Sequence, residues 1–193
     1  KGIIKKIFLS RISTVFASGK LHVELLKALK YKDMIKITKG VGIINRPKYK
    51  IINREYNRNF LFVGRLSIEK NIKSIVMIFN ELPSYQLTLI GIGPLEKELK
   101  IMAKSNIVFL GQINNFDLKN HFLNNDILIL PSISEPWGLV VEEALYFGMP
   151  VIVSENCGAS ELIINEVNGF ILIENNLKEI ISNINKDKYK RII

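Results

Sequence analysis

The chain has 193 residues, enough for one domain with an appendage, and its 48% hydrophobic residues with 12 Gly and 6 Pro indicate a globular rather than a disordered protein. No apolar run approaches the roughly 18 to 20 residues of a membrane span, and the first residues do not resemble a signal peptide. The single Cys157 excludes an internal disulfide and a multi-cysteine metal cluster, and this low cysteine content fits a reducing compartment. The net charge of +9 is uneven, because residues 1–60 carry 15 Lys and Arg against 3 acids, whereas residues 61–193 carry 12 against 15.

The basic first third of the chain indicates either a solubilising surface or docking on an anionic membrane surface, and both interpretations stay open. Nucleic acid is not an expected partner, because no recognition motif accompanies the charge and the aromatic residues are not arranged as stacking platforms.

Apolar runs bounded by turn residues predict strands, and segments with a 3.6-residue period predict helices. The first part of the chain predicts a strand at 13–18, a helix at 19–30 and a strand at 34–38, followed by a linker rich in polar residues, Gly and Pro. From residue 59 the two kinds of element alternate. The predicted strands are 59–64, 86–90, 107–111, 126–131, 151–154 and 169–173, and the predicted helices are 71–82, 94–104, 116–123, 138–147, 158–164 and 177–184.

This alternation, with continuously apolar strands, predicts an α/β fold with a parallel sheet covered by helices on both faces. Right-handed crossovers make such a sheet doubly wound and Rossmann-like. Ligands of these sheets bind at the carboxyl ends of the strands, where the strand order reverses. Residues that directly follow a predicted strand are therefore the candidates for a binding site.

Candidate ligand-binding residues follow the first two strands of this series, although the glycines of the second set are also explained by turn formation alone. Arg65 and Lys70 flank the turn into a helix, where cationic side chains and the helix N-terminus together suit a phosphate or diphosphate, although a solvated pair also explains them. Gly91 and Gly93 permit a tight turn and a close approach of backbone to a ligand. Glu96 stands where a dinucleotide-binding fingerprint needs a small residue, so we do not expect a nicotinamide or flavin site, and no Walker A motif follows.

Three glutamates surround the start of the predicted helix 138–147. Glu135 precedes the helix, where the amides of Gly138 and Leu139 lack intrahelical acceptors and suit an anion. Glu142 and Glu143 both fall off the apolar face, so periodicity cannot choose between them. A first-turn glutamate that complements the helix dipole explains either of these two, but it explains Glu135 less easily.

The other reactive side chains indicate no site. His22 and His121 lie in amphipathic helical patterns and have no acid-rich or cysteine spacing that would indicate a metal site. No serine lies in a nucleophile elbow, and no other protein nucleophile stands out.

The motifs together resemble a known family. In chain order they are VGRLSIEK, LIGIGP, VFLG, DILILPS, SEPWGLVVEEALYFGMPVIVS, CGASELI and NGFIL. This series resembles the C-terminal, nucleotide-sugar-binding domain of family 4 glycosyltransferases, which are retaining enzymes of the GT-B fold, over about residues 59–175.

The resemblance implies a role for each candidate residue. The family's two glutamates are separated by seven residues, and Ala follows the second, which selects Glu135 and Glu143 here and makes Glu142 a bystander. Arg65 and Lys70 would hold the donor diphosphate, Glu143 the ribose and Glu135 the donor sugar. The implied catalytic residues are Glu135, Arg65 and Lys70, and the implied donor-binding residues are Gly64, Arg65, Lys70, Gly91, Gly93, Glu135, Gly138, Leu139, Val140 and Glu143.

The resemblance also implies the reaction and its partners. It predicts sugar transfer from a nucleoside-diphosphate sugar to a sugar or lipid-linked saccharide acceptor in polysaccharide or glycoconjugate synthesis. It predicts no cofactor and no metal, and a cytoplasmic location, peripheral on the inner face of the membrane if the basic third docks there. Two alternatives are a non-catalytic nucleotide-sugar-binding module without its acceptor domain and, less favoured, a nucleotide-sugar epimerase.

The expected domain organisation follows the family's two-domain pattern. Residues 1–40 would be the end of an N-terminal acceptor-side domain, and TKGVGIIN resembles the family's interdomain Asn-Gly-Val-Asp. Residues 41–58 would be the interdomain linker, residues 59–185 the nucleotide-sugar-binding domain and residues 186–193 a C-terminal tail.

Overall fold

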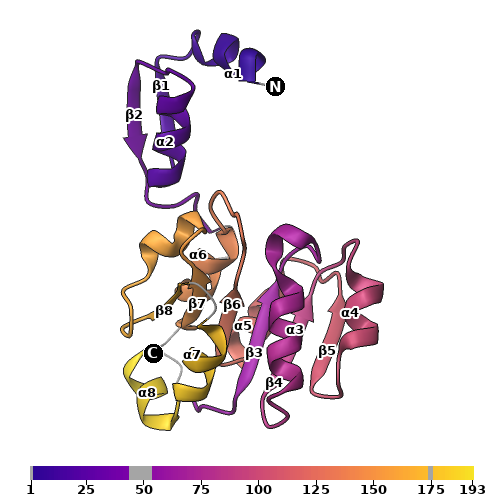
Figure 1. Ribbon diagram of the computed structural model, residues 1–193. Coiled ribbons are helices and arrows are strands. Elements are labelled where there is room, and N and C mark those ends of the chain that lie inside the picture. The colour runs from indigo at the N-terminus through magenta and orange to yellow at the C-terminus, as the bar shows by residue number, and fades with distance from the viewer. Residues whose placement is uncertain (1, 44–53, 174–175) are drawn as a thin grey trace.

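The structure is a computed structural model that describes residues 2–43, 54–173 and 176–193. A small N-terminal unit lies beside a larger domain built on a six-stranded sheet (Figure 1). Most of the predicted linker, residues 44–53, lies outside the described residues.

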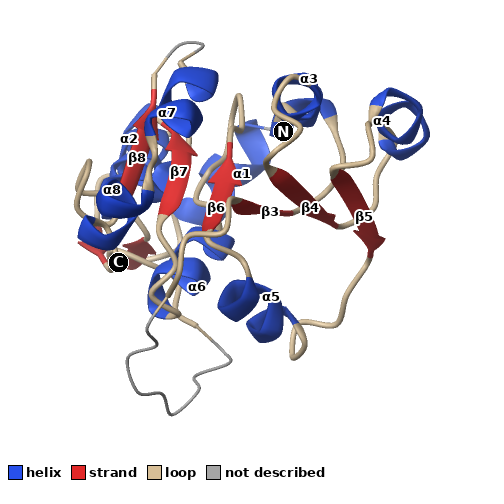
Figure 2. Cartoon of the chain, turned by 90° about the horizontal axis from the view of Figure 1, so that it is seen from below, coloured by secondary structure: helices blue, strands red, loops and turns tan. Residues whose placement is uncertain are grey.

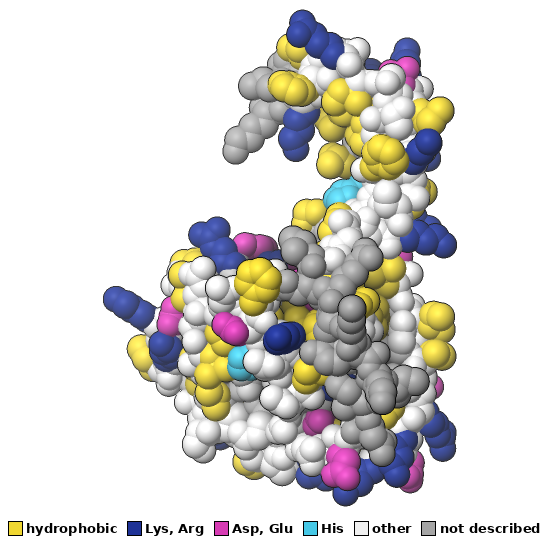
Figure 3. Space-filling model, turned by 180° about the vertical axis from the view of Figure 1, so that it is seen from behind, with side chains coloured by type: hydrophobic (Ala, Val, Ile, Leu, Met, Phe, Trp, Pro, Cys, Tyr) yellow, Lys and Arg dark blue, Asp and Glu magenta, His cyan; other side chains and the backbone are white. Residues whose placement is uncertain are grey.

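The N-terminal unit contains the predicted strand–helix–strand and one helix that the sequence did not predict. Strands β1 and β2 pair in parallel, with Thr14 opposite Met34. Many of its apolar side chains are exposed, including Phe8 and Phe16, and they are spread over the unit in Figure 3. Its elements are α1 (Gly2–Leu9), β1 (Thr14–Ala17), α2 (Lys20–Ala28) and β2 (Met34–Ile37).

The larger domain confirms the predicted parallel, doubly wound sheet. Its strand order is β5-β4-β3-β6-β7-β8, and every neighbouring pair is parallel. Helices cover both faces, with α3 and α4 on one side and α5 and α6 on the other (Figure 2), so the central strands are buried and read as continuous apolar runs. The strands are β3 (Asn59–Val63), β4 (Gln86–Ile90), β5 (Ile107–Gly111), β6 (Ile127–Leu130), β7 (Val151–Ser154) and β8 (Gly169–Leu172).

The helices agree with the predicted positions, with two differences in type. The predicted helix 71–82 is preceded by a 3₁₀ turn, and the predicted helix 158–164 is itself 3₁₀. The helical elements are η1 (Ile68–Lys70), α3 (Ile72–Asn80), α4 (Glu96–Met102), α5 (Leu118–Asn124), α6 (Leu139–Tyr146), η2 (Gly158–Leu162), α7 (Leu177–Asn183) and α8 (Lys186–Arg191).

The strand order reverses between β3 and β6, and we call the position at the carboxyl ends of these two strands the crevice. The chain builds β3, β4 and β5 outward in one direction and then returns to place β6 on the other side of β3. The connections that leave the carboxyl ends of these two adjacent strands therefore run apart, which creates the ligand-binding position of an open parallel sheet.

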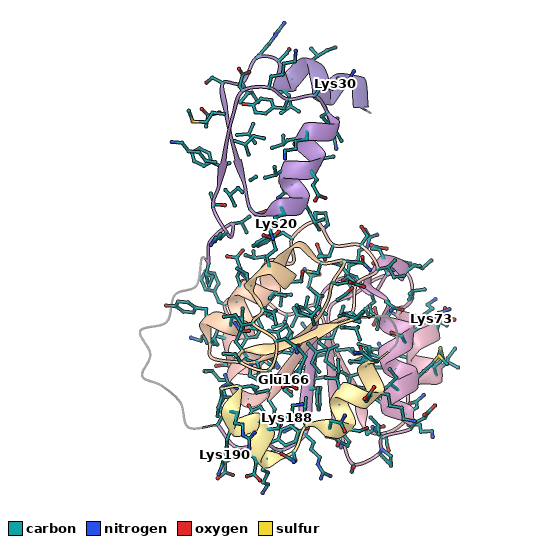
Figure 4. The ribbon with its side chains drawn as sticks, turned by 60° about the vertical axis from the view of Figure 1, so that its left-hand side comes forward. Lys20, Lys30, Lys73, Glu166, Lys188 and Lys190 are labelled. Atoms are coloured by element: carbon teal, nitrogen blue, oxygen red, sulfur yellow. The ribbon has the colours of Figure 1, made fainter. Side chains whose placement is uncertain are left out.

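Residues 186–193, expected as a tail, instead contain α8, which closes the domain. Tyr189 is fully buried, stacks on Tyr56 with ring centroids 5.0 Å apart, and donates its hydroxyl to the Asp126 carbonyl at 3.1 Å. Lys188 pairs with Glu166 at 2.8 Å, and both are labelled in Figure 4. Apolar burial thus gives the C-terminal segment a fixed place against the first residues of the domain.

A buried arginine joins the connecting segment to two helix ends. The Arg54 guanidinium donates to the carbonyls of Phe122 and Phe147 at 2.8 Å each and to that of Asn125 at 2.9 Å. These carbonyls lie at the C-termini of α5 and α6, where unpaired oxygens and the helix dipole favour a cation. The sequence pattern did not single out this residue.

Candidate functional site

Lys70 and Glu135 meet across the crevice between β3 and β6. Lys70 ends η1, which follows β3, and Glu135 lies in the loop after β6, and their side chains form an ion pair with exposed fractions of 18% and 13%. The Ile133 amide donates to the Glu69 carbonyl at 2.9 Å and joins the two loops close to the pair. Burial lowers the pKa of Lys70, and the nearby Glu69 carboxylate opposes that shift. The sequence predicted both residues for the site but not their direct contact.

Arg65 lies on the same side of the sheet, directly after β3, and its side chain is exposed. The backbone around it is held by the loop after β4, because Gly64 donates to Ile90 at 2.9 Å and Leu66 donates to Ile92 at 3.0 Å. These bonds prolong the β3–β4 pairing beyond the strands. They leave the Arg65 side chain free to reach an anion over the crevice.

The close contact between these two loops explains Gly91 and Gly93. A Cβ on Gly91 would lie 1.9 Å from the Gly64 carbonyl oxygen, and a Cβ on Gly93 would lie 2.3 Å from that of Leu66. Gly91 also has a φ of +131°, which L side chains rarely adopt. Backbone packing therefore requires both glycines, and their role in leaving space for a nucleotide stays a prediction.

The loop that carries Glu135 is fixed to the segment after β7. Gly158 donates its amide to the Glu135 carbonyl at 2.9 Å, and Ala159 donates to the Trp137 carbonyl at 2.7 Å. Gly138, the N-cap of α6, has a φ of +91°, and a Cβ on it would lie 2.8 Å from the Cys157 sulfur. This packing directs the start of α6, with Leu139 and Val140, toward the carboxyl edge of the sheet.

Glu143 is the buried member of the glutamate pair on α6. Its side chain is 9% exposed, and burial, together with the neighbouring Glu142 carboxylate, raises its pKa. Burial of a carboxyl group favours its neutral form over its charged form. Ionisable groups with such shifted pKa values are common at functional sites. The structure thus distinguishes Glu142 from Glu143 by their surroundings, a distinction that helix periodicity could not make.

Glu142, expected to be a bystander of the donor site, has structural contacts that the sequence did not predict, and its place outside the donor-binding set stays a prediction. Its carboxylate accepts the Trp137 indole N–H, the Val41 amide at 2.9 Å and the Gly42 amide at 3.2 Å. The motif that selected Glu143 carried no information about these contacts. They join residues about one hundred positions apart in the chain, which no local pattern reveals.

Replacing Glu143 with glutamine is expected to stabilise the fold at neutral pH and, through the ribose contact that the family resemblance implies, to weaken nucleotide binding. Because the pKa of Glu143 is raised in the fold, the stability it contributes is complete below the ordinary carboxyl pKa and is lost as the pH rises through the raised value. The amide of Glu143→Gln would not ionise and would escape this loss. Urea unfolding at several pH values measures the effect, which should vanish in acid.

Nucleotide affinity should move the opposite way in this variant. An amide offers one acceptor oxygen where the carboxylate offers two, so we expect affinity to fall about tenfold. The exposed Glu179→Gln is the matched control and should change neither quantity. Equal stability of wild type and Glu143→Gln at neutral pH would contradict the prediction.

In the described residues, neither histidine belongs to a second candidate catalytic or metal site. His22 contacts Ser18 within the N-terminal unit, and the His121 carbonyl accepts from Asn125 at 2.9 Å. Within residues 2–43, 54–173 and 176–193, no three His, Cys, Asp or Glu side chains gather as a metal site. Metal independence stays a prediction.

In the part of the chain that the structure describes, every helix is too short or too polar to cross a bilayer. Docking of the basic first third on an anionic membrane also stays a prediction.

A model of the family described as glycosyl transferases group 1 matches residues 45–188. The chain belongs to this family. The matched range includes Glu135, Glu143, the loop that carries Lys70 and the whole six-stranded sheet.

Known relatives of this group 1 glycosyltransferase are longer proteins. An uncharacterized glycosyltransferase of Methanocaldococcus jannaschii is 29% identical over 73% of this chain and 36% of its own length. An Escherichia coli galactosyltransferase, named for UDP-Gal and α-D-GlcNAc-diphosphoundecaprenol, is 29% identical over 84% of this chain and 45% of its own. The chain thus spans less than half the length of these relatives.

Solved structures show the same fold. HepE of Anabaena, in complex with UDP and glucose, aligns with a TM-score of 0.82 and 21% identity over 99% of this chain and 59% of that protein. The aligned region includes the N-terminal unit as well as the sheet domain, which confirms the GT-B interpretation of the fold.

Proposed function

We propose that this chain is the donor-binding half of a retaining glycosyltransferase that takes a nucleoside-diphosphate sugar and transfers the sugar to a saccharide or lipid-linked acceptor. The observation that carries the proposal is the meeting of Lys70 and Glu135 at the crevice between β3 and β6. The two side chains come from loops 65 residues apart, and both lie where open parallel sheets bind ligands.

The proposed chemistry assigns each group a separate task. Departure of a nucleoside diphosphate leaves negative charge on its phosphates, which Arg65 and Lys70 would stabilise as fixed cations without a metal. The donor sugar becomes oxocarbenium-like, and the Glu135 carboxylate beside it would stabilise the positive charge. Glu143, buried on α6, would accept the ribose hydroxyls.

The ion pair gives this assignment a consistent resting state. Without a ligand, Lys70 and Glu135 neutralise each other. A diphosphate would take Lys70 as its partner and release Glu135 toward the sugar. The site would thus exchange one charge pair for two contacts with the donor, and neither charge would be left unpaired in the crevice.

Calorimetric titration of the chain with UDP, GDP and ADP, with and without chelator, tests the proposal. UDP is the first choice because the HepE structure holds it. We expect one of the three nucleotides to bind equally well in chelator, and we expect Glu143→Ala and Arg65→Ala each to weaken binding about tenfold or more. Unchanged affinity in both variants would disprove the proposed site.

A second candidate is a non-catalytic module that lends its donor site to another chain. Sugar transfer by the 193-residue chain alone would exclude it. Formation of an epimerised sugar without transfer would instead indicate a nucleotide-sugar epimerase.

A further inference from the structure

Glu142 connects three N–H groups from two parts of the chain. Its Oε1 accepts from the Trp137 indole and from the Val41 amide at 2.9 Å, and its Oε2 accepts from the Gly42 amide at 3.2 Å. We call this arrangement the Glu142 clamp, meaning Glu142 with the N–H groups of Trp137, Val41 and Gly42. A glutamate that merely complements the helix dipole would not gather donors from outside its own helix.

Trp137 brings the clamp to the proposed donor site. It follows Glu135 by two residues and precedes Gly138, and its side chain is 6% exposed. Because a buried indole N–H needs an acceptor, Glu142 fixes the ring in place. The ring then fixes the short backbone stretch between Glu135 and the start of α6.

The Trp137 ring also contacts the N-terminal unit. A Cβ built on Gly19, the residue before α2, would lie 2.6 Å from the ring. The next amide, that of Lys20, donates to the Glu161 carboxylate of η2 at 2.5 Å. Figure 4 shows Lys20 at the end of α2 that faces the larger domain. The N-terminal unit therefore touches the larger domain at the loop that carries Glu135.

We propose that Glu142 is a positioning residue, which holds the Glu135 loop through Trp137 and ties it to the connection between the two parts of the chain. The position of residues 40–42 then affects how Glu135 is presented to the donor. Glu142 lies next to Glu143 on α6, so the connection and the proposed ribose contact share one helical turn. The inference rests on the proposed function for its ligand, but the clamp can be measured without one.

Trp137 is the single tryptophan of the chain, so intrinsic fluorescence reports on the clamp directly. In Glu142→Ala we expect emission to shift to longer wavelength and acrylamide to quench it more steeply, because the ring, now 6% exposed, would no longer be held by Glu142 and would be more accessible to water. UDP affinity should fall about tenfold, since a displaced loop misplaces its donor contacts. Glu24→Ala, which removes an exposed glutamate of α2, is the matched control and should behave as wild type.

Two further variants, which do not truncate the Glu142 side chain, keep the test decisive if Glu142→Ala folds poorly. Glu142→Gln retains one acceptor oxygen, so its emission and affinity should lie between those of wild type and Glu142→Ala. In Gly40→Ala the new Cβ would lie 2.7 Å from the Glu142 Oε2, and the φ of +149° is one that L side chains rarely adopt, so the carboxylate or the backbone of residue 40 must move although the carboxylate is still present. This variant should shift the emission in the same direction as Glu142→Ala.

The outcomes separate this inference from the proposed function. Wild-type emission and quenching in both Glu142 variants would overturn the clamp. Altered emission with unchanged UDP affinity of the folded protein would show that Glu142 supports the fold alone and would overturn its positioning role. If the wild type binds none of the three nucleotides, the proposed donor site fails, and the fluorescence alone then decides whether the clamp exists.

Discussion

Lys70→Ala is expected to weaken the binding of a nucleoside diphosphate by about 10- to 150-fold, the range of a lost hydrogen bond to a charged group. The loss has two causes. The diphosphate loses a cation, and the partly buried Glu135 carboxylate, with 13% of its side chain exposed, stays unpaired and repels the ligand. Calorimetric titration with UDP measures the effect.

Glu135→Gln should leave the same affinity unchanged or raise it. Removing the carboxylate frees Lys70 from its partner, so UDP should bind as tightly as before or several-fold more tightly, whereas preference for the sugar-bearing donor over UDP should decrease. Lys73→Ala is the matched control, because Lys73 lies three residues on, is 46% exposed and pairs with Glu98 outside the crevice. Equal UDP affinity in Lys70→Ala and Lys73→Ala would contradict the proposed role of the ion pair.

Arg54→Met is expected to lower the free energy of unfolding by about 3 kcal/mol or more, because three carbonyls lose a charged donor. Arg54 is buried, with 8% exposed, so water would not easily replace it. The variant should also weaken nucleotide binding, since Arg54 holds the C-terminal end of α6, the helix that carries Glu143. Urea unfolding followed by circular dichroism measures the stability.

Arg191→Met is the matched control for Arg54. Arg191 is exposed at the end of α8 and contributes there only the small, screened effect of a cation near a helix C-terminus, below about 1 kcal/mol. A loss under about 1 kcal/mol in Arg54→Met would show that water or a rearranged side chain satisfies the carbonyls in its place.

The sequence predicted the centre of the sheet well because the strands β6 and β7 are buried on both sides. Strand β6 is buried at all four positions, so its sequence is a continuous apolar run, which is typical of a buried parallel strand. The places of Arg65, Lys70 and Glu135 followed from the same rule, since each lies in the loop after a strand. The contact between Lys70 and Glu135 required the strand order, which sequence periodicity does not contain.

Other features depended on contacts between distant residues. Arg54 looked like one more cation of a basic segment, yet it is buried against helix ends that lie 68 and 93 positions further along the chain. Glu142 and Glu143 are neighbours with the same side chain; the family's glutamate spacing selected Glu143, but the contacts of each carboxylate follow only from the surroundings of α6. Helix α8, KDKYKR, is charged at every position but one, so its single buried residue, Tyr189, gave too weak a signal.

The contact between Tyr56 and Tyr189 has a consequence for how the chain folds. Tyr56, before β3, stacks on Tyr189 of α8, whose hydroxyl donates to the carbonyl of Asp126 just before β6, so the two ends of the described domain lie together. During synthesis this contact can form only after α8 has emerged from the ribosome, because it joins Tyr189 to residues much earlier in the chain. Adjacent ends also make this domain suited to circular permutation, with new termini in one of its surface loops.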